Sequence, residues 1–102
     1  MTNMEIANTI LSQMGGTGRI AAMTGAGKGK RRFIAIENGV QFGFGLNNQM
    51  NTVRITLNAM DTYDVEFWKI GKNTKKVKEF NDVYCDMLID IFESTTGLYL
   101  TL

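Results

Sequence analysis

Apolar residues recur at helical spacing near the start of the chain. The positions concerned are Ile6, Ala7, Ile10, Leu11 and Met14. Thr2 and Glu5 precede them in the T-x-x-E order of a capping box, in which each side chain accepts a hydrogen bond from the other residue's backbone N–H. Gly15-Gly16 follows, and glycine tolerates the left-handed conformation that ends many helices. The pattern predicts an N-terminal helix whose apolar face packs against the rest of the fold.

The middle of the chain alternates apolar and polar residues, which is typical of strands with one buried face. Asn38-Gly39 lies between two such runs and is a strong hairpin signal, because both turn positions favour positive φ. Lysines in the last run would guard a sheet edge against pairing with another chain. The predicted strands are residues 20–24, 33–37, 40–46, 52–58, 64–68 and 74–79.

A second amphipathic pattern begins at Asn81, a good N-cap residue, and ends at Gly97. It predicts a helix over residues 82–95 with one apolar face and one face made only of carboxylates. The acidic positions are Glu79, Asp82, Asp86, Asp90 and Glu93. The order of helix, antiparallel strands and helix predicts a single α+β domain over residues 1–102, with about five strands flanked by an N-terminal and a C-terminal helix on one sheet face.

Composition supports one domain and excludes several kinds of chemistry. The 102 residues are 44% hydrophobic and 21% charged, as in ordinary globular domains. With no histidine and one cysteine, the chain lacks His-dependent catalysis, an internal disulfide and a zinc site. We therefore expect a non-enzymatic protein without a cofactor or a metal. The N-terminus does not resemble a signal peptide, no stretch approaches the roughly 20 apolar residues of a membrane span, and the lone Cys85 suits a reducing cytoplasm.

Charge is divided unevenly along the chain. Residues 1–60 carry six basic and two acidic side chains, a net charge of +4, whereas residues 61–102 carry five basic and eight acidic ones, a net charge of −3. Four bases gather in a glycine-rich stretch, namely Lys28, Lys30, Arg31 and Arg32. Their spacing matches neither a Walker A motif nor a dinucleotide-binding fingerprint. Two interpretations remain, a loop that contacts nucleic-acid phosphates and a solvated hairpin loop.

Trp68 is the one tryptophan of the chain, and the alternation places it on the sheet face away from the core, on the same side as Arg54. An aromatic ring beside a base on an open sheet is how many single-strand binders stack nucleotides. The alternative is a tryptophan that lies over the sheet or under residues 98–100. The candidate nucleic-acid-binding residues are therefore Lys28, Lys30, Arg31, Arg32, Arg54 and Trp68.

The acidic helix face has two comparable interpretations. Asp82, Asp86, Asp90 and Glu93 would form a phosphate-mimicking surface that binds a basic host protein. Alternatively they form a solvated face, compensated by the helix N-terminus and by nearby lysines. A divalent-metal site is a weaker third interpretation, because these carboxylates would lie along a line and would not converge.

Several longer strings resemble a family of small uncharacterised proteins that bacterial phages, prophages and integrative mobile elements encode. The strings are residues 7–16 (ANTILSQMGG), 21–26 (AAMTGA), 53–67 (VRITLNAMDTYDVEF), 83–88 (VYCDML) and 92–100 (FESTTGLYL). The resemblance implies action in the cytoplasm of a bacterial host and implies no reaction. We therefore expect a nucleic-acid-associated accessory protein or, alternatively, an anti-CRISPR-like inhibitor that binds a host defence protein through the acidic face.

Overall fold

The computed structural model describes residues 1–45 and 47–100. Its five strands form one antiparallel sheet in the order β1-β2-β3-β4-β5, so neighbours in the sheet are also neighbours in sequence. The predicted α+β class, with an antiparallel sheet and an N-terminal and a C-terminal helix, is confirmed. The elements are α1 (Asn3–Gln13), α2 (Thr17–Thr24), the 3-10 turn η1 (Gly29–Arg31), β1 (Ile34–Ile36), β2 (Gly39–Gly43), β3 (Thr52–Leu57), β4 (Tyr63–Lys69), β5 (Lys75–Val83), the 3-10 turn η2 (Cys85–Met87) and α3 (Leu88–Thr96).

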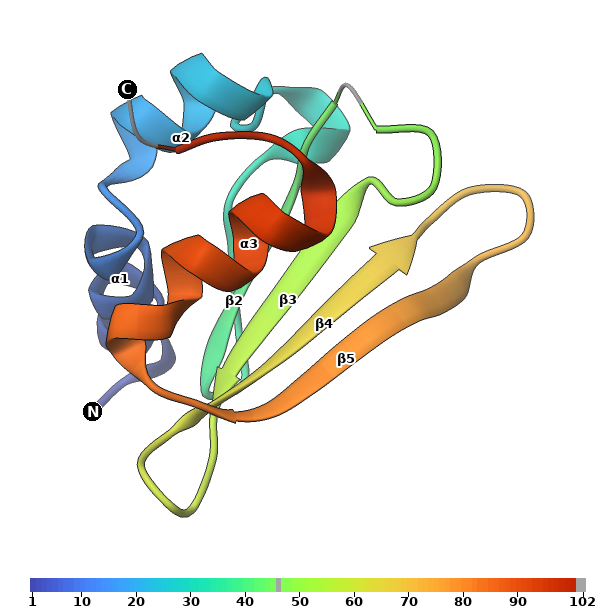
Figure 1. Ribbon diagram of the computed structural model, residues 1–102. Helices are drawn as coiled ribbons and strands as arrows, with labels where there is room; N and C mark the ends of the chain where they lie inside the picture. Colours follow the sequence, from blue (N-terminus) through green and yellow to red (C-terminus); the bar gives the residue numbers. More distant parts are fainter. Residues whose placement is uncertain (46, 101–102) are drawn as a thin grey trace.

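The three helices lie on one face of the sheet and enclose the core with it (Figure 1). Phe92 of α3 is at the centre of an aromatic cluster, with its ring centroid 5.3 Å from that of Phe44 and 6.1–6.2 Å from those of Phe42 and Phe67. Within the described residues the opposite face of the sheet carries no α-helix (Figure 1), and only the 3-10 turn η1 packs on it, at Gly43. None of the helices in these residues has the length and apolar character that a bilayer crossing requires.

The start of α1 is fixed by the predicted capping box. Thr2 Oγ1 accepts from the backbone N–H of Glu5 at 3.2 Å, and Glu5 Oε1 accepts from the backbone N–H of Thr2 at 3.0 Å. The pKa of the Glu5 carboxyl is lowered chiefly by this backbone hydrogen bond from Thr2, and further by the Thr2 side chain. Asn3 Oδ1 accepts from the backbone N–H of Asn38, which ties the helix to the β1–β2 turn.

Thr2→Ala is expected to lower the free energy of unfolding by about 1 kcal/mol, because it removes an N-cap side chain and leaves an unpaired backbone donor. Chemical denaturation measures the loss. Thr9→Ala is the matched control, because Thr9 lies exposed within the same helix, where alanine is a better helix former. Equal losses in the two variants would contradict the capping role of Thr2.

Residues 20–24 were predicted to form a strand, and this prediction is wrong because they belong to α2. Ile20 and Thr24 lie one helical turn apart on its buried side, and Thr24 Oγ1 donates to the carbonyl oxygen of Ile20 at 2.7 Å. Gly25 then ends the helix in the left-handed conformation. A run of five residues is too short to separate the two periods, so packing against the core decides the conformation.

The first half of the second predicted helix is also wrong. β5 extends to Val83, which pairs with Tyr63 of β4. The backbone N–H of Asp82 donates to the Asp64 carboxylate at 3.4 Å. Asn81 is therefore a strand residue and not an N-cap, and α3 begins only after η2. This pairing joins residues about twenty positions apart, so a local helical pattern does not reveal it.

The predicted hairpin forms, with a turn shifted by one residue. Ile36 pairs with Gly39, so the two turn residues are Glu37 and Asn38, and of these only Asn38 has a positive φ, at 58°. Gly39 lies in β2 against β3, where an added Cβ would come 2.0 Å from the carbonyl oxygen of Ile55. Glycine is required there by this close approach of two strands. β2 ends at Gly43, and position 46 of the predicted strand lies outside the described residues.

Candidate nucleic-acid interface

Polar side chains form a connected row across the helix-free face of the sheet. Arg54 in β3 donates from Nε and Nη2 to the side-chain oxygen of Gln41 in β2, at 3.1 and 2.9 Å. Its guanidinium carbon lies 5.5 Å from the centre of the Trp68 ring. Glu66 accepts from the Trp68 indole N–H at 3.1 Å and lies 3.9 Å from Arg54. Arg54 is therefore already engaged by three neighbours and orients them.

The row continues to the edge strand through two further charges. Lys76 Nζ lies 3.7 Å from Glu66 and 3.1 Å from Glu79. The hydrogen bond to Glu79 is the main cause that raises the pKa of Lys76 above its ordinary value. Two bases thus face two carboxylates, so the middle of this face has no excess charge with which to attract an anion.

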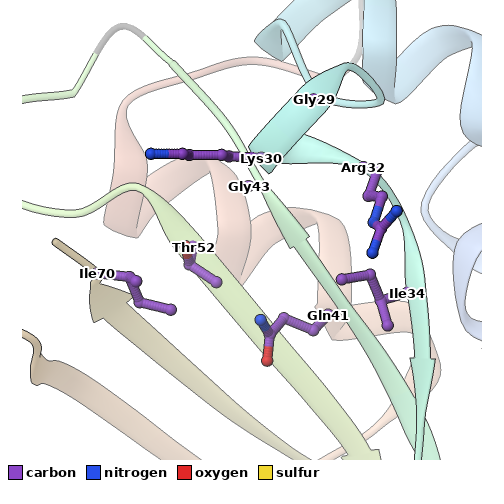
Figure 2. Close-up of a pocket in the computed structure, with 8 residues that line it drawn as sticks. All are labelled: Gly29, Lys30, Arg32, Ile34, Gln41, Gly43, Thr52 and Ile70. Atoms are coloured by element: carbon purple, nitrogen blue, oxygen red, sulfur yellow. The ribbon is translucent and has the colours of Figure 1, made fainter.

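A hollow of about 360 Å³ opens beside this row, at the end of the sheet where β1 and β3 begin (Figure 2). η1 is anchored there on β2, because Gly43 has no side chain and an added Cβ would come 2.9 Å from the Cα of Arg31. The basic stretch is therefore packed onto the sheet. The residues that line the hollow are Gly29, Lys30, Arg32, Ile34, Gln41, Gly43, Thr52 and Ile70.

Two more hollows adjoin the first, and Ile70 lines all three. One lies between η1 and the start of β3, and the other is formed by the β4–β5 hairpin. Six basic residues line the three hollows, and none of the lining residues is acidic. We call these six residues the basic end; they are Lys30, Arg31, Arg32, Lys69, Lys72 and Lys75.

The topology explains why these bases meet. Successive connections of an antiparallel meander alternate between the two ends of the sheet. The segment before β1 and the β4–β5 hairpin therefore share one end, although they lie some forty residues apart. The opposite end carries Glu37, Asp61, Asp64 and Asp82, which we call the acidic end. The net charge of +1 thus conceals two oppositely charged ends of one sheet.

The structure unites some of the predicted nucleic-acid-binding residues and separates others. Lys30 and Arg32 line the first hollow, whereas Lys28 lines a different hollow beside α2. The guanidinium of Arg31 lies against Gly45, where an added Cβ would come 3.0 Å from Nη1. Trp68 shares the helix-free face with Arg54 as predicted, and one face of its ring meets the Arg54 guanidinium.

The predicted acidic helix face does not form. Asp82 is in β5 with a φ of 57°, Asp86 is in η2, and only Asp90 and Glu93 belong to α3. The Glu93 carboxylate accepts from the backbone N–H of Leu100 at 2.7 Å. The early part of the predicted helix is a strand, so the four carboxylates do not share one helical surface. Among the described residues no group of three or more acidic or cysteine side chains is arranged to hold a metal ion.

Several residues of this site were not singled out in the sequence. Lys72 and Lys75 were interpreted only as edge protection or as compensation for the acidic helix face, and Lys69, Ile70 and Gln41 had no assigned role. A signal was available for the lysines, because counting connections in a five-strand meander places the fourth turn beside the entry to the first strand.

Comparison of the chain with known protein families, with curated proteins and with solved structures finds no match.

Proposed function

We propose that this protein is a non-enzymatic nucleic-acid-binding protein that holds a phosphate backbone against its basic end. The observation that carries the proposal is the meeting of six bases from two distant segments around three adjoining hollows, with no acidic residue lining them. Phosphate contacts by lysine and arginine supply most of the sequence-independent affinity of nucleic-acid-binding proteins. An accessory role in a phage or mobile element, in the cytoplasm of a bacterial host, belongs to the same proposal.

The distribution of ion pairs supports this assignment of the binding surface. In the described part of the chain, Lys30 and Arg32 have no carboxylate within ion-pair distance, whereas Arg54 and Lys76 do. Unpaired bases are available to phosphate without first losing a partner. The alternative, an inhibitor that binds a basic host protein through Asp82, Asp86, Asp90 and Glu93, lacks the continuous helical surface on which it depended.

The salt dependence of oligonucleotide binding tests the proposal. We expect Lys30→Ala combined with Arg32→Ala to weaken binding of any labelled DNA or RNA oligonucleotide and to reduce the slope of log K against log salt by about one for each lost phosphate contact. Fluorescence anisotropy over a salt series measures both quantities. The thermal midpoint should not fall, because both side chains are exposed.

The matched control is Arg19→Ala combined with Lys78→Ala, which removes the same charge from residues that line none of the three hollows. This variant should keep the slope of the wild type. If the two double variants weaken binding equally, net charge alone is responsible and the basic end is not a site. If the wild type binds no oligonucleotide at low salt, the proposed function is wrong.

A further inference from the structure

The first hollow offers more than charge. Ile34 and Ile70 face each other across its width, with Arg32 beside Ile34 and Lys30 extending toward the side of Ile70 (Figure 2). These two isoleucines remain 37% and 42% exposed, although both are large apolar side chains. Bases that needed only to hold a phosphate backbone would not require an apolar wall on either side. The hollow therefore suits a ligand with a charged part and a flat or apolar part.

The floor of the hollow presents an oriented hydrogen-bonding group. The Nε and Nη2 groups of Arg54 both donate to the side-chain oxygen of Gln41, at 3.1 and 2.9 Å. This arrangement leaves the Gln41 amide nitrogen to donate, and it has no acceptor among the described residues. Beside it, the Thr52 hydroxyl donates to Asn51 Oδ1 at 3.0 Å, which leaves its own oxygen able to accept. Arg54 acts here as a positioning residue for Gln41.

We infer that this hollow holds one unpaired nucleotide of a single-stranded nucleic acid. The base lies between Ile34 and Ile70 above Gln41 and Thr52, and the phosphates on its two sides contact Lys30 and Arg32. A hollow of about 360 Å³ falls in the range of roughly 300–1,000 Å³ that small-ligand sites occupy. The inference rests on the proposed function, because it specifies which form of nucleic acid the basic end receives.

An unpaired nucleotide explains the hollow better than a duplex does. In a duplex the faces of the bases are stacked on their neighbours, so only phosphates, sugars and base edges reach a protein surface. Ile34, Ile70 and the Gln41 amide would then contact nothing specific. A splayed base of a single strand has a free face for apolar contact and free edges that accept and donate hydrogen bonds.

A pair of oligonucleotides separates charge from base recognition. One probe is a fluorescein-labelled oligothymidylate, and the other is an abasic oligodeoxynucleotide of the same length and charge. At fixed salt we expect the wild type to bind oligothymidylate about tenfold more tightly, because burial of the base face adds to the phosphate contacts. A duplex with the same number of phosphates should resemble the abasic probe, and oligouridylate should resemble oligothymidylate.

The variant Ile70→Ser should abolish this preference, with oligothymidylate binding falling to the level of the abasic probe. Met60→Ser is the matched control, because Met60 is 77% exposed in the β3–β4 turn at the acidic end; it should keep the preference. Equal binding of the two probes by the wild type, or an equal loss for both probes in Ile70→Ser, overturns the inference. Equal binding leaves the proposed function intact, whereas failure of every probe to bind at low salt refutes both.

Discussion

Replacing Phe92 with alanine is expected to lower the free energy of unfolding by about 3–5 kcal/mol. The Phe92 side chain is 1% exposed and lies within aromatic contact distance of Phe42, Phe44 and Phe67, which come from the sheet and from the loop after β2. Removing the ring leaves a cavity beneath α3 and separates three other rings from their shared neighbour. Urea denaturation followed by circular dichroism measures the loss.

Tyr84→Ala controls for the loss of an aromatic residue in the same C-terminal region. Tyr84 is 63% exposed, so its replacement should change stability by no more than about 0.5 kcal/mol. Because a domain of this size has a total stability of roughly 5–15 kcal/mol, the Phe92 variant should be easily distinguished from the control. A loss of less than about 1 kcal/mol for Phe92→Ala would show that α3 does not close the core.

The second large effect is expected at Gly39, where alanine should cost about 3 kcal/mol or more. Its Cβ would come 2.0 Å from the Ile55 carbonyl oxygen and 2.9 Å from the Thr56 Cα, both of them backbone atoms of β3. Backbone in a paired strand cannot move aside without breaking the register of Gly39 with Thr56. The free energy of unfolding from chemical denaturation is again the measurement.

Gly71→Ala is the matched control for this substitution. No heavy atom lies within 4 Å of a Cβ added at Gly71, and its φ is not positive, so alanine should be tolerated within about 0.5 kcal/mol. If Gly39→Ala proved as stable as Gly71→Ala, β2 and β3 would have to be farther apart than the structure places them.

The strands and α1 could be predicted because their signals are local. Period-two alternation marks β2, β3 and β4, and the box formed by Thr2 and Glu5 marks the start of α1. The predictions failed where a distant contact decides the conformation. Val83 continues a strand because Tyr63 is its partner, and residues 20–24 are helical because Ile20 is buried in the core. Neither contact leaves a local pattern.

The residues of the candidate site could likewise be predicted only where their signal is local in the sequence. Lys30 and Arg32 were identified from their clustering in sequence, and Arg54 and Trp68 from alternation. Sequence reasoning did not identify the neighbouring residues that complete the site. Gln41 becomes an oriented donor only because Arg54 reaches it from the neighbouring strand, and Ile70 lines the hollow only because η1 folds over Gly43. Both depend on register and close packing, which composition does not reveal.

The separation of the basic and acidic ends gives the molecule a large electric dipole along its strands, with about 20 Å between the opposite charges of a seven-residue strand. The net charge of +1 provides almost no monopole attraction. A dipole loses its pull over a shorter distance than a net charge, and physiological salt confines the field to about 8 Å. On a nearby polyanion of the kind proposed above, this field would therefore orient the molecule more than attract it, so that its basic end faces the polyanion before contact.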